Sequence, residues 1–121
     1  MSERAIIVWG EIPVTDMEKA VAFYNVVFGY DMKIDNSGPN PMAVLGPSEA
    51  TGGAHLYPGK PASDNGNTIH LGVEGSLEDG MDRCWKAGGQ VLSPAIAIPA
   101  GRFAYAKDLD GNSIGLFEAT A

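Results

Sequence analysis

The sequence predicts an α+β fold: two tandem βαβββ modules form an open eight-stranded, barrel-like sheet with a concave cavity, and both helices lie outside. Two observations lead to this prediction. Strand-like and helix-like segments follow in the same order in each half of the 121 residues. A shift of 59 residues also superposes Val14 on Val73 and Gly29 on Gly88. We therefore expect an internal duplication within one domain, with modules at 1–57 and 67–121 and a linker at 58–66.

The first strand and helix are predicted from residues 6–30. An apolar run leads to Thr15, whose hydroxyl can cap a helix while Glu18 reaches back as the other half of a capping box. Gly29 then offers the left-handed residue that ends a helix. Between them, apolar residues recur at helical spacing, so one face should pack on a sheet; they are Met17, Ala20, Val21, Tyr24, Val27 and Phe28.

The rest of the first half reads as short strands separated by turns. We expect strands at 30–35, 42–45 and 52–57, because β-forming residues there are bounded by clusters of Gly, Pro, Asn and Ser. Segment 58–66 is too rich in Pro, Gly and Asn for regular structure, so it is predicted to link the modules.

The second half repeats this order. A strand is predicted at 67–74. It is followed by a helix that begins at Ser76 and Asp79 and ends at residues 87–89. Strands are then expected at 90–93, 102–107 and 113–118, with a connection at 94–101 and a tight hairpin turn at 108–112. Cys84 is the single cysteine and falls in the helical apolar pattern, so it is predicted to be a core residue.

Composition excludes several function classes. The formal net charge is −7 and the eight Lys and Arg are scattered, whereas nucleic acid and anionic membranes require a basic face. Apolar runs are far shorter than a membrane span, and no signal-peptide pattern precedes the first strand, so we expect a cytoplasmic protein.

Strand alternation predicts which side chains line the cavity. Ile12, Val14, Leu71 and Val73 are apolar and should face the helices. The alternate positions should then face the hollow; they are Trp9, Glu11, Thr68 and His70. The 59-residue shift places Glu11 on His70, so these two side chains are predicted to approach each other across the pseudo-two-fold axis.

Further cavity candidates follow from the remaining strands. Gly115 and Phe117 lie on the same face of the last predicted strand, so both should border the hollow. Glu118 lies on the opposite face and should be a solvated carboxylate. Arg102 and Tyr105 have opposite parity, so only one of them can point inward.

Several motifs spread over nearly the whole chain point to a known family. They are Glu11-Ile12-Pro13-Val14-Thr15-Asp16-Met17-Glu18-Lys19-Ala20, Phe23-Tyr24, Phe28-Gly29, Ala87-Gly88-Gly89, Gly101-Arg102-Phe103 and Asp108-Leu109-Asp110-Gly111-Asn112. With these motifs the chain resembles the vicinal oxygen chelate superfamily, which contains the glyoxalases, the bleomycin-resistance proteins and the extradiol dioxygenases. It looks most like the bacterial branch related to lactoylglutathione lyase, although Leu109 stands where the family usually has proline.

The resemblance implies metal-ligand positions on four strands. The first, third and fourth positions fall on Trp9, Thr68 and Gly115. The second falls on Ala54 or, if the alignment is shifted by one residue, on His55. Indole and glycine supply no ligand atom, so we expect no metal and no other cofactor. The alternative is a divalent metal held through His55, His70 and Glu11.

We therefore expect a glyoxalase-like protein that binds a small organic molecule in its cavity without the family's metal. The alternative is an enzyme of lyase, isomerase or dioxygenase type, either metal-dependent or using Glu11 and His70 as acid and base. A role in protein interaction is the third possibility. A homodimer is also expected, because an open sheet leaves strand edges to protect.

Overall fold

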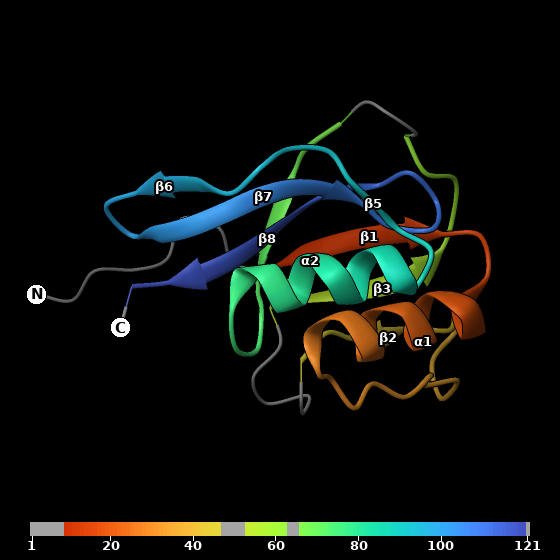
Figure 1. Ribbon diagram of the computed structural model, residues 1–121. Helices are drawn as coiled ribbons and strands as arrows, with labels where there is room; N and C mark the ends of the chain where they lie inside the picture. The colour runs from red at the N-terminus through yellow and green to blue at the C-terminus, as the bar shows by residue number, and fades with distance from the viewer. Residues whose placement is uncertain (1–8, 47–52, 63–65, 121) are drawn as a thin grey trace, which may run out of the picture.

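The computed structural model of the chain describes residues 9–46, 53–62 and 66–120. Two helices and two open sheets occupy this part of the chain, as the sequence predicts (Figure 1). The elements follow in the order β1 (Gly10–Val14), α1 (Met17–Phe28), β2 (Ala43–Val44), β3 (Ala54–Pro58), β4 (Ile69–Gly72), α2 (Leu77–Lys86), β5 (Gln90–Val91), β6 (Ile96–Ile98), β7 (Gly101–Lys107) and β8 (Ser113–Ala119).

The two sheets pair their strands in the same way. The first sheet has the order β1-β3-β2, and the second has β4-β8-β7-β5 with β6 on β7. β1 is parallel to β3 and places Glu11 opposite His55, while β4 is parallel to β8 and places His70 opposite Gly115. Glu11 and His70 are the residues that the 59-residue shift superposes, so the repeated pairing agrees with the predicted repeat of βαβββ units.

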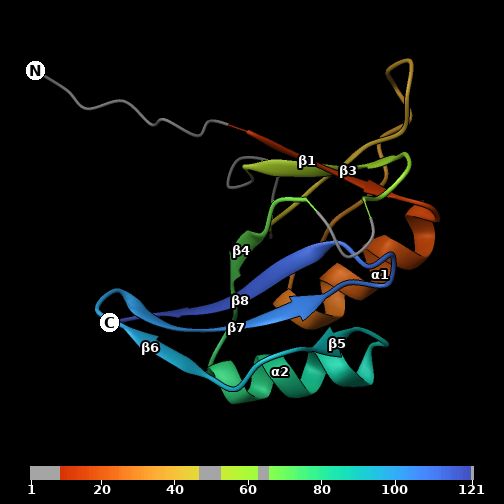
Figure 2. The ribbon, with the colours of Figure 1, turned by 90° about the horizontal axis from the view of Figure 1, so that it is seen from above.

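Both helices pack on the same side of the sheets and share one core (Figure 2). Ile12 and Val14 of β1 are buried there, as the alternation predicts. Cys84 of α2 is fully buried in this core, which confirms its predicted place, and burial raises the pKa of its thiol to about 11. This thiol is therefore protonated at neutral pH and is no nucleophile.

The ends of the helices follow the predicted signals except at one residue. Gly29 has a φ of 72° and its N–H bonds the carbonyl of Asn25, and Ser76 accepts from the backbone N–H of Asp79. The cap of α1 is Asp16 and not Thr15, because the Asp16 carboxylate accepts from the backbone N–H of Lys19 at 3.1 Å. Thr15 instead donates its hydroxyl to Asp110.

Two strand predictions need correction. Residues 30–35 form no strand and contribute only the isolated bridge between Asp35 and Met42. The side-chain amide of Asn25 bonds both backbone groups of Met32, which holds this segment against α1. The predicted connection at 94–101 contains β6, which pairs with β7. Residue 52 of the predicted strand at 52–57 and residues 63–65 of the predicted linker lie outside the described residues.

Candidate functional site

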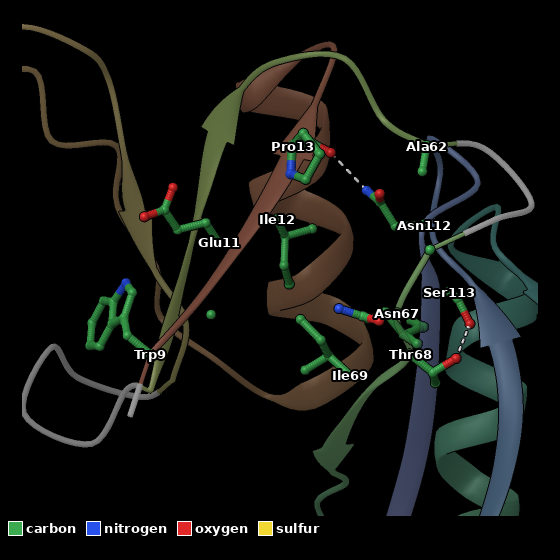
Figure 3. A pocket seen from close by; sticks show the side chains of 13 residues that line it. Trp9, Glu11, Ile12, Pro13, Ala62, Asn67, Thr68, Ile69, Asn112 and Ser113 are labelled. Atoms are coloured by element: carbon green, nitrogen blue, oxygen red, sulfur yellow. Dashed lines mark hydrogen bonds between the residues drawn. The ribbon is translucent and has the colours of Figure 1, made fainter. Parts of the chain in front are cut away.

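A pocket of about 700 Å³ lies where the two sheets meet, between β1 and the beginnings of β4 and β8 (Figure 3). We call it the seam pocket. Three isoleucines, Ile12, Ile69 and Ile114, give it an apolar wall, and Glu11 is the one ionisable residue of its described lining. The other lining residues are Trp9, Gly10, Pro13, Ala62, Gly66, Asn67, Thr68, Asn112 and Ser113.

One rim of the seam pocket is built by β1 and supported by β3. Trp9 and Glu11 project to the same side of β1 (Figure 3), and the Trp9 ring is 45% exposed. The indole Nε1 donates to Nδ1 of His55 at 2.8 Å. Because an indole N–H can only donate, Nδ1 of His55 carries no proton and the ring proton sits on Nε2. Ala54 is buried, so of Ala54 and His55 it is His55 that lies on the same side as Glu11.

The opposite rim is polar and comes from the second sheet. The hydroxyls of Thr68 and Ser113 are hydrogen-bonded to each other at 2.5 Å (Figure 3). The Asn112 amide donates to the carbonyl of Pro13 at 2.7 Å, so it ties this rim to β1. Sequence reasoning missed Asn112, because 108–112 is predicted only as a turn. It also missed Ser113, because only Gly115 and Phe117 of the strand 113–118 are assigned to the cavity.

A buried carboxylate fixes that turn. Asp108 is 5% exposed and accepts from the Tyr24 hydroxyl at 2.7 Å, from the backbone N–H groups of Asp110 and Asn112, and from the Asn112 side chain. Burial, followed by the nearby Asp108 carboxylate, raises the pKa of Tyr24 well above its ordinary value. Tyr24 therefore stays a neutral donor. The position of Asn112 is fixed by its hydrogen bonds to the buried Asp108.

His70 lies outside the lining of the seam pocket, in an aromatic group on β4 and β7. Its ring meets Phe103 edge-on at 5.1 Å and Tyr105 at 5.9 Å between centroids. A Cβ on Gly115 would overlap the imidazole of His70, so the space left by this glycine is filled by the His70 ring. Phe117 pairs with Phe103 across β7 and β8 on the same side.

The described residues show no hydrogen bond or ion pair between Glu11 and His70. Glu11 borders the seam pocket, whereas His70 packs on Phe103 and Tyr105. The predicted approach of these two side chains, and their use as acid and base, stays a prediction.

Arg102 and Tyr105 take opposite faces of β7. Arg102 forms two hydrogen bonds with the carboxylate of Glu78 and one with Glu118, away from the aromatic group. Glu118 was expected to be solvated, but it is held by Arg102 and by the backbone N–H of Leu77. The guanidinium lowers the pKa of Glu118 and brings that of Glu78 to about 2.

The side chains at the implied ligand positions do not fit a divalent metal. The Trp9 nitrogen donates its proton to His55, and Gly115 has no side chain. Within residues 9–46, 53–62 and 66–120, no group of three or more His, Cys, Asp or Glu side chains could hold a metal ion. These positions therefore offer a divalent metal no complete set of ligand atoms.

Comparison with known proteins places this fold. Residues 7–38 match the family model described as bleomycin resistance protein-like N-terminal. The structure of a glyoxalase/bleomycin resistance protein from Albidiferax ferrireducens superposes with a TM-score of 0.73, covering 96% of this chain and 100% of the other at 17% identity. The chain therefore has the fold of the glyoxalase/bleomycin resistance proteins.

Two relatives are similar in sequence. The putative glyoxylase CFP32 of Mycobacterium bovis and Mycobacterium tuberculosis is 31% identical in an alignment of 119 positions, which covers 92% of this chain and 44% of the relative. The chain thus spans less than half the length of these curated relatives. TnmS3, described as an antibiotic binding protein from Streptomyces sp. CB03234, is 26% identical with a TM-score of 0.65 and covers 99% of this chain and 100% of its own.

Neither α1 nor α2, the helices of the described part, has the length and hydrophobicity needed to cross a membrane.

Proposed function

We propose that this protein binds a small planar aromatic molecule in the seam pocket, without a divalent metal in the binding step. The observation that carries the proposal is the composition of the pocket's two rims. Trp9 offers a half-exposed aromatic face beside one carboxylate, and Thr68, Ser113 and Asn112 offer polar groups opposite. A few polar groups set against apolar walls are typical of small-molecule sites.

The negative charge of the seam pocket favours a cationic ligand. Glu11 is the one ionisable side chain among the described lining residues, and the whole chain carries −7. A cationic aromatic ligand would gain attraction from the Glu11 carboxylate and from the general field of the protein, whereas an anionic one would be repelled. The description of TnmS3 as an antibiotic binding protein supports binding as the function class.

The proposal is tested by calorimetric titration with two matched probes, 9-aminoacridine as a planar cation and acridine-9-carboxylate as a planar anion. We expect 9-aminoacridine to bind in a 1:1 ratio and acridine-9-carboxylate to bind at least several-fold more weakly. Trp9→Ala should weaken binding of 9-aminoacridine by roughly ten-fold, the usual value of an aromatic stack.

Trp85→Ala is the matched control, since Trp85 is 66% exposed on α2 and outside the seam pocket. Equal effects of the two tryptophan variants, or no saturable binding of either probe, would count against the proposed site.

We also propose that the chain forms a homodimer. Tyr105 and Leu92 are exposed on and beside β7, and the edges of both sheets are open. Size-exclusion chromatography with light scattering is expected to give twice the chain mass of 12.7 kDa. A monomer at micromolar concentration would refute this part.

A further inference from the structure

A second hollow, of about 400 Å³, lies between the two helices and shares no residue with the seam pocket. α1 and α2 run side by side in opposite directions (Figure 1). We call this hollow the helix groove; its lining residues are Lys19, Ala22, Phe23, Val26, Arg83, Lys86, Ala87 and Leu109. The aromatic ligand proposed for the seam pocket would not contact the helix groove.

The apolar lining of the helix groove is partly in solvent. Val26 is 54% exposed and Leu109 is 43% exposed, although both are large aliphatic residues. Leu109 packs over Gly88 at the end of α2. Ala22 and Phe23 complete the wall on α1. Covering these side chains would remove apolar surface from water.

Positive charge gathers at the same hollow. Three of the chain's eight Lys and Arg line it, in a protein of net charge −7. Lys86 is paired with Asp82 at 2.8 Å. The Arg83 guanidinium is held by the carbonyls of Val27 and Glu74, both at 2.9 Å, and forms no ion pair within the described chain. The Lys19 ammonium likewise has no carboxylate partner among the residues described.

We propose that the helix groove binds a small aliphatic carboxylate, with the anion beside the Lys19 ammonium and the chain on Val26 and Leu109. The Arg83 guanidinium, which the carbonyls of Val27 and Glu74 hold near the end of α1, adds positive charge to the groove without contacting the anion. The exposed walls are aliphatic, which favours an alkyl chain over an aromatic ring. The volume lies within the range of small-molecule pockets and admits a chain of about eight carbons.

The test uses calorimetric titration with sodium octanoate, and with octan-1-ol and octylammonium as neutral and cationic probes of equal length. We expect octanoate to bind saturably in a 1:1 ratio and the other two to bind at least ten-fold more weakly. Lys19→Gln should weaken octanoate binding about two- to five-fold at low ionic strength, because an exposed charge pair contributes little and is screened by salt. Lys33→Gln is its control, because Lys33 is exposed, lies outside both hollows and loses the same charge.

A second pair of variants tests the apolar wall. Leu109→Asn should weaken octanoate binding several-fold, whereas Leu92→Asn, an equally exposed leucine outside the helix groove, should leave it unchanged. Trp9→Ala should also have no effect, which separates this site from the seam pocket. Equal affinity for all three probes, no saturable binding of octanoate, or equal effects within either variant pair would overturn the proposal.

Discussion

The Tyr24 hydroxyl donates to Oδ2 of Asp108 at 2.7 Å and so joins α1 of the first half to the β7–β8 turn of the second. The same turn holds Thr15 through Asp110 and the carbonyl of Pro13 through Asn112. These contacts connect the two modules beside the seam pocket. The pocket wall therefore depends on a hydrogen bond in the core.

Tyr24→Phe is expected to destabilise the fold by about 1–2 kcal/mol, because it removes one donor from a buried carboxylate. Asp108 keeps its bonds to Asp110 and Asn112, so the chain should still fold. Urea denaturation measures the change. Tyr105→Phe, at an exposed tyrosine, should be neutral, and a Tyr24→Phe variant as stable as Tyr105→Phe would contradict the role given to this bond.

Asn112→Ala should lower both stability and ligand affinity. It removes the bond to the Pro13 carbonyl and one bond to Asp108, and the expected loss of stability is about 1–3 kcal/mol. Titration with 9-aminoacridine should show weaker binding than in the parent protein, because the polar rim is no longer tied to β1. Unchanged affinity would mean that this tie does not shape the seam pocket.

The ion pairs of Arg102 predict a dependence of stability on pH. The guanidinium lowers the pKa of Glu78 from 4.5 to about 2 and lowers that of Glu118 as well. A carboxyl with a lowered folded-state pKa stabilises the fold above its unfolded-state pKa, and this contribution is lost as the pH falls toward the folded value. Arg102→Gln should therefore lose less stability than the parent between about pH 5 and pH 3. Parallel stability curves for the two proteins would rule this out.

Gly115→Ala is expected to displace the His70 ring from β8. A Cβ there would overlap the imidazole, and His70 is exposed enough to turn away. The imidazole proton resonances of His70 should shift in NMR spectra, because the ring leaves the edge-on contact with Phe103. Gly72→Ala on β4 is the matched control, since a Cβ at Gly72 meets nothing within 4 Å. Similar spectra for both variants would refute this arrangement.

Much of the fold could be predicted from local signals. The Gly29 stop, the Ser76 cap and the burial of Ile12 and Val14 depend on residues close in sequence, and each is found in the structure. The failures have non-local causes. Segment 30–35 is held by the Asn25 side chain instead of by a neighbouring strand, and Thr15 is engaged by Asp110 from the far end of the chain.

The candidate site was harder to predict than the fold. Strand alternation alone predicts that Trp9, Glu11 and Thr68 face the cavity, and all three line the seam pocket. His70 is predicted by the same alternation and lies outside this lining. Asn112 and Ser113 reach the pocket through the pairing of β4 with β8, which no local pattern encodes. Strand alternation also could not decide whether Ala54 or His55 faces the pocket, because the answer depends on the register of β1 against β3.

The central claim is tested most directly by titrating 9-aminoacridine into protein stripped of metal with EDTA, and again after adding manganese, zinc, nickel or iron(II). We predict the same saturable affinity in every case, with roughly ten-fold weaker binding for Trp9→Ala in each, since a lost aromatic stack costs about 1–3 kcal/mol. Binding that appears only after a metal is added would contradict a metal-independent site.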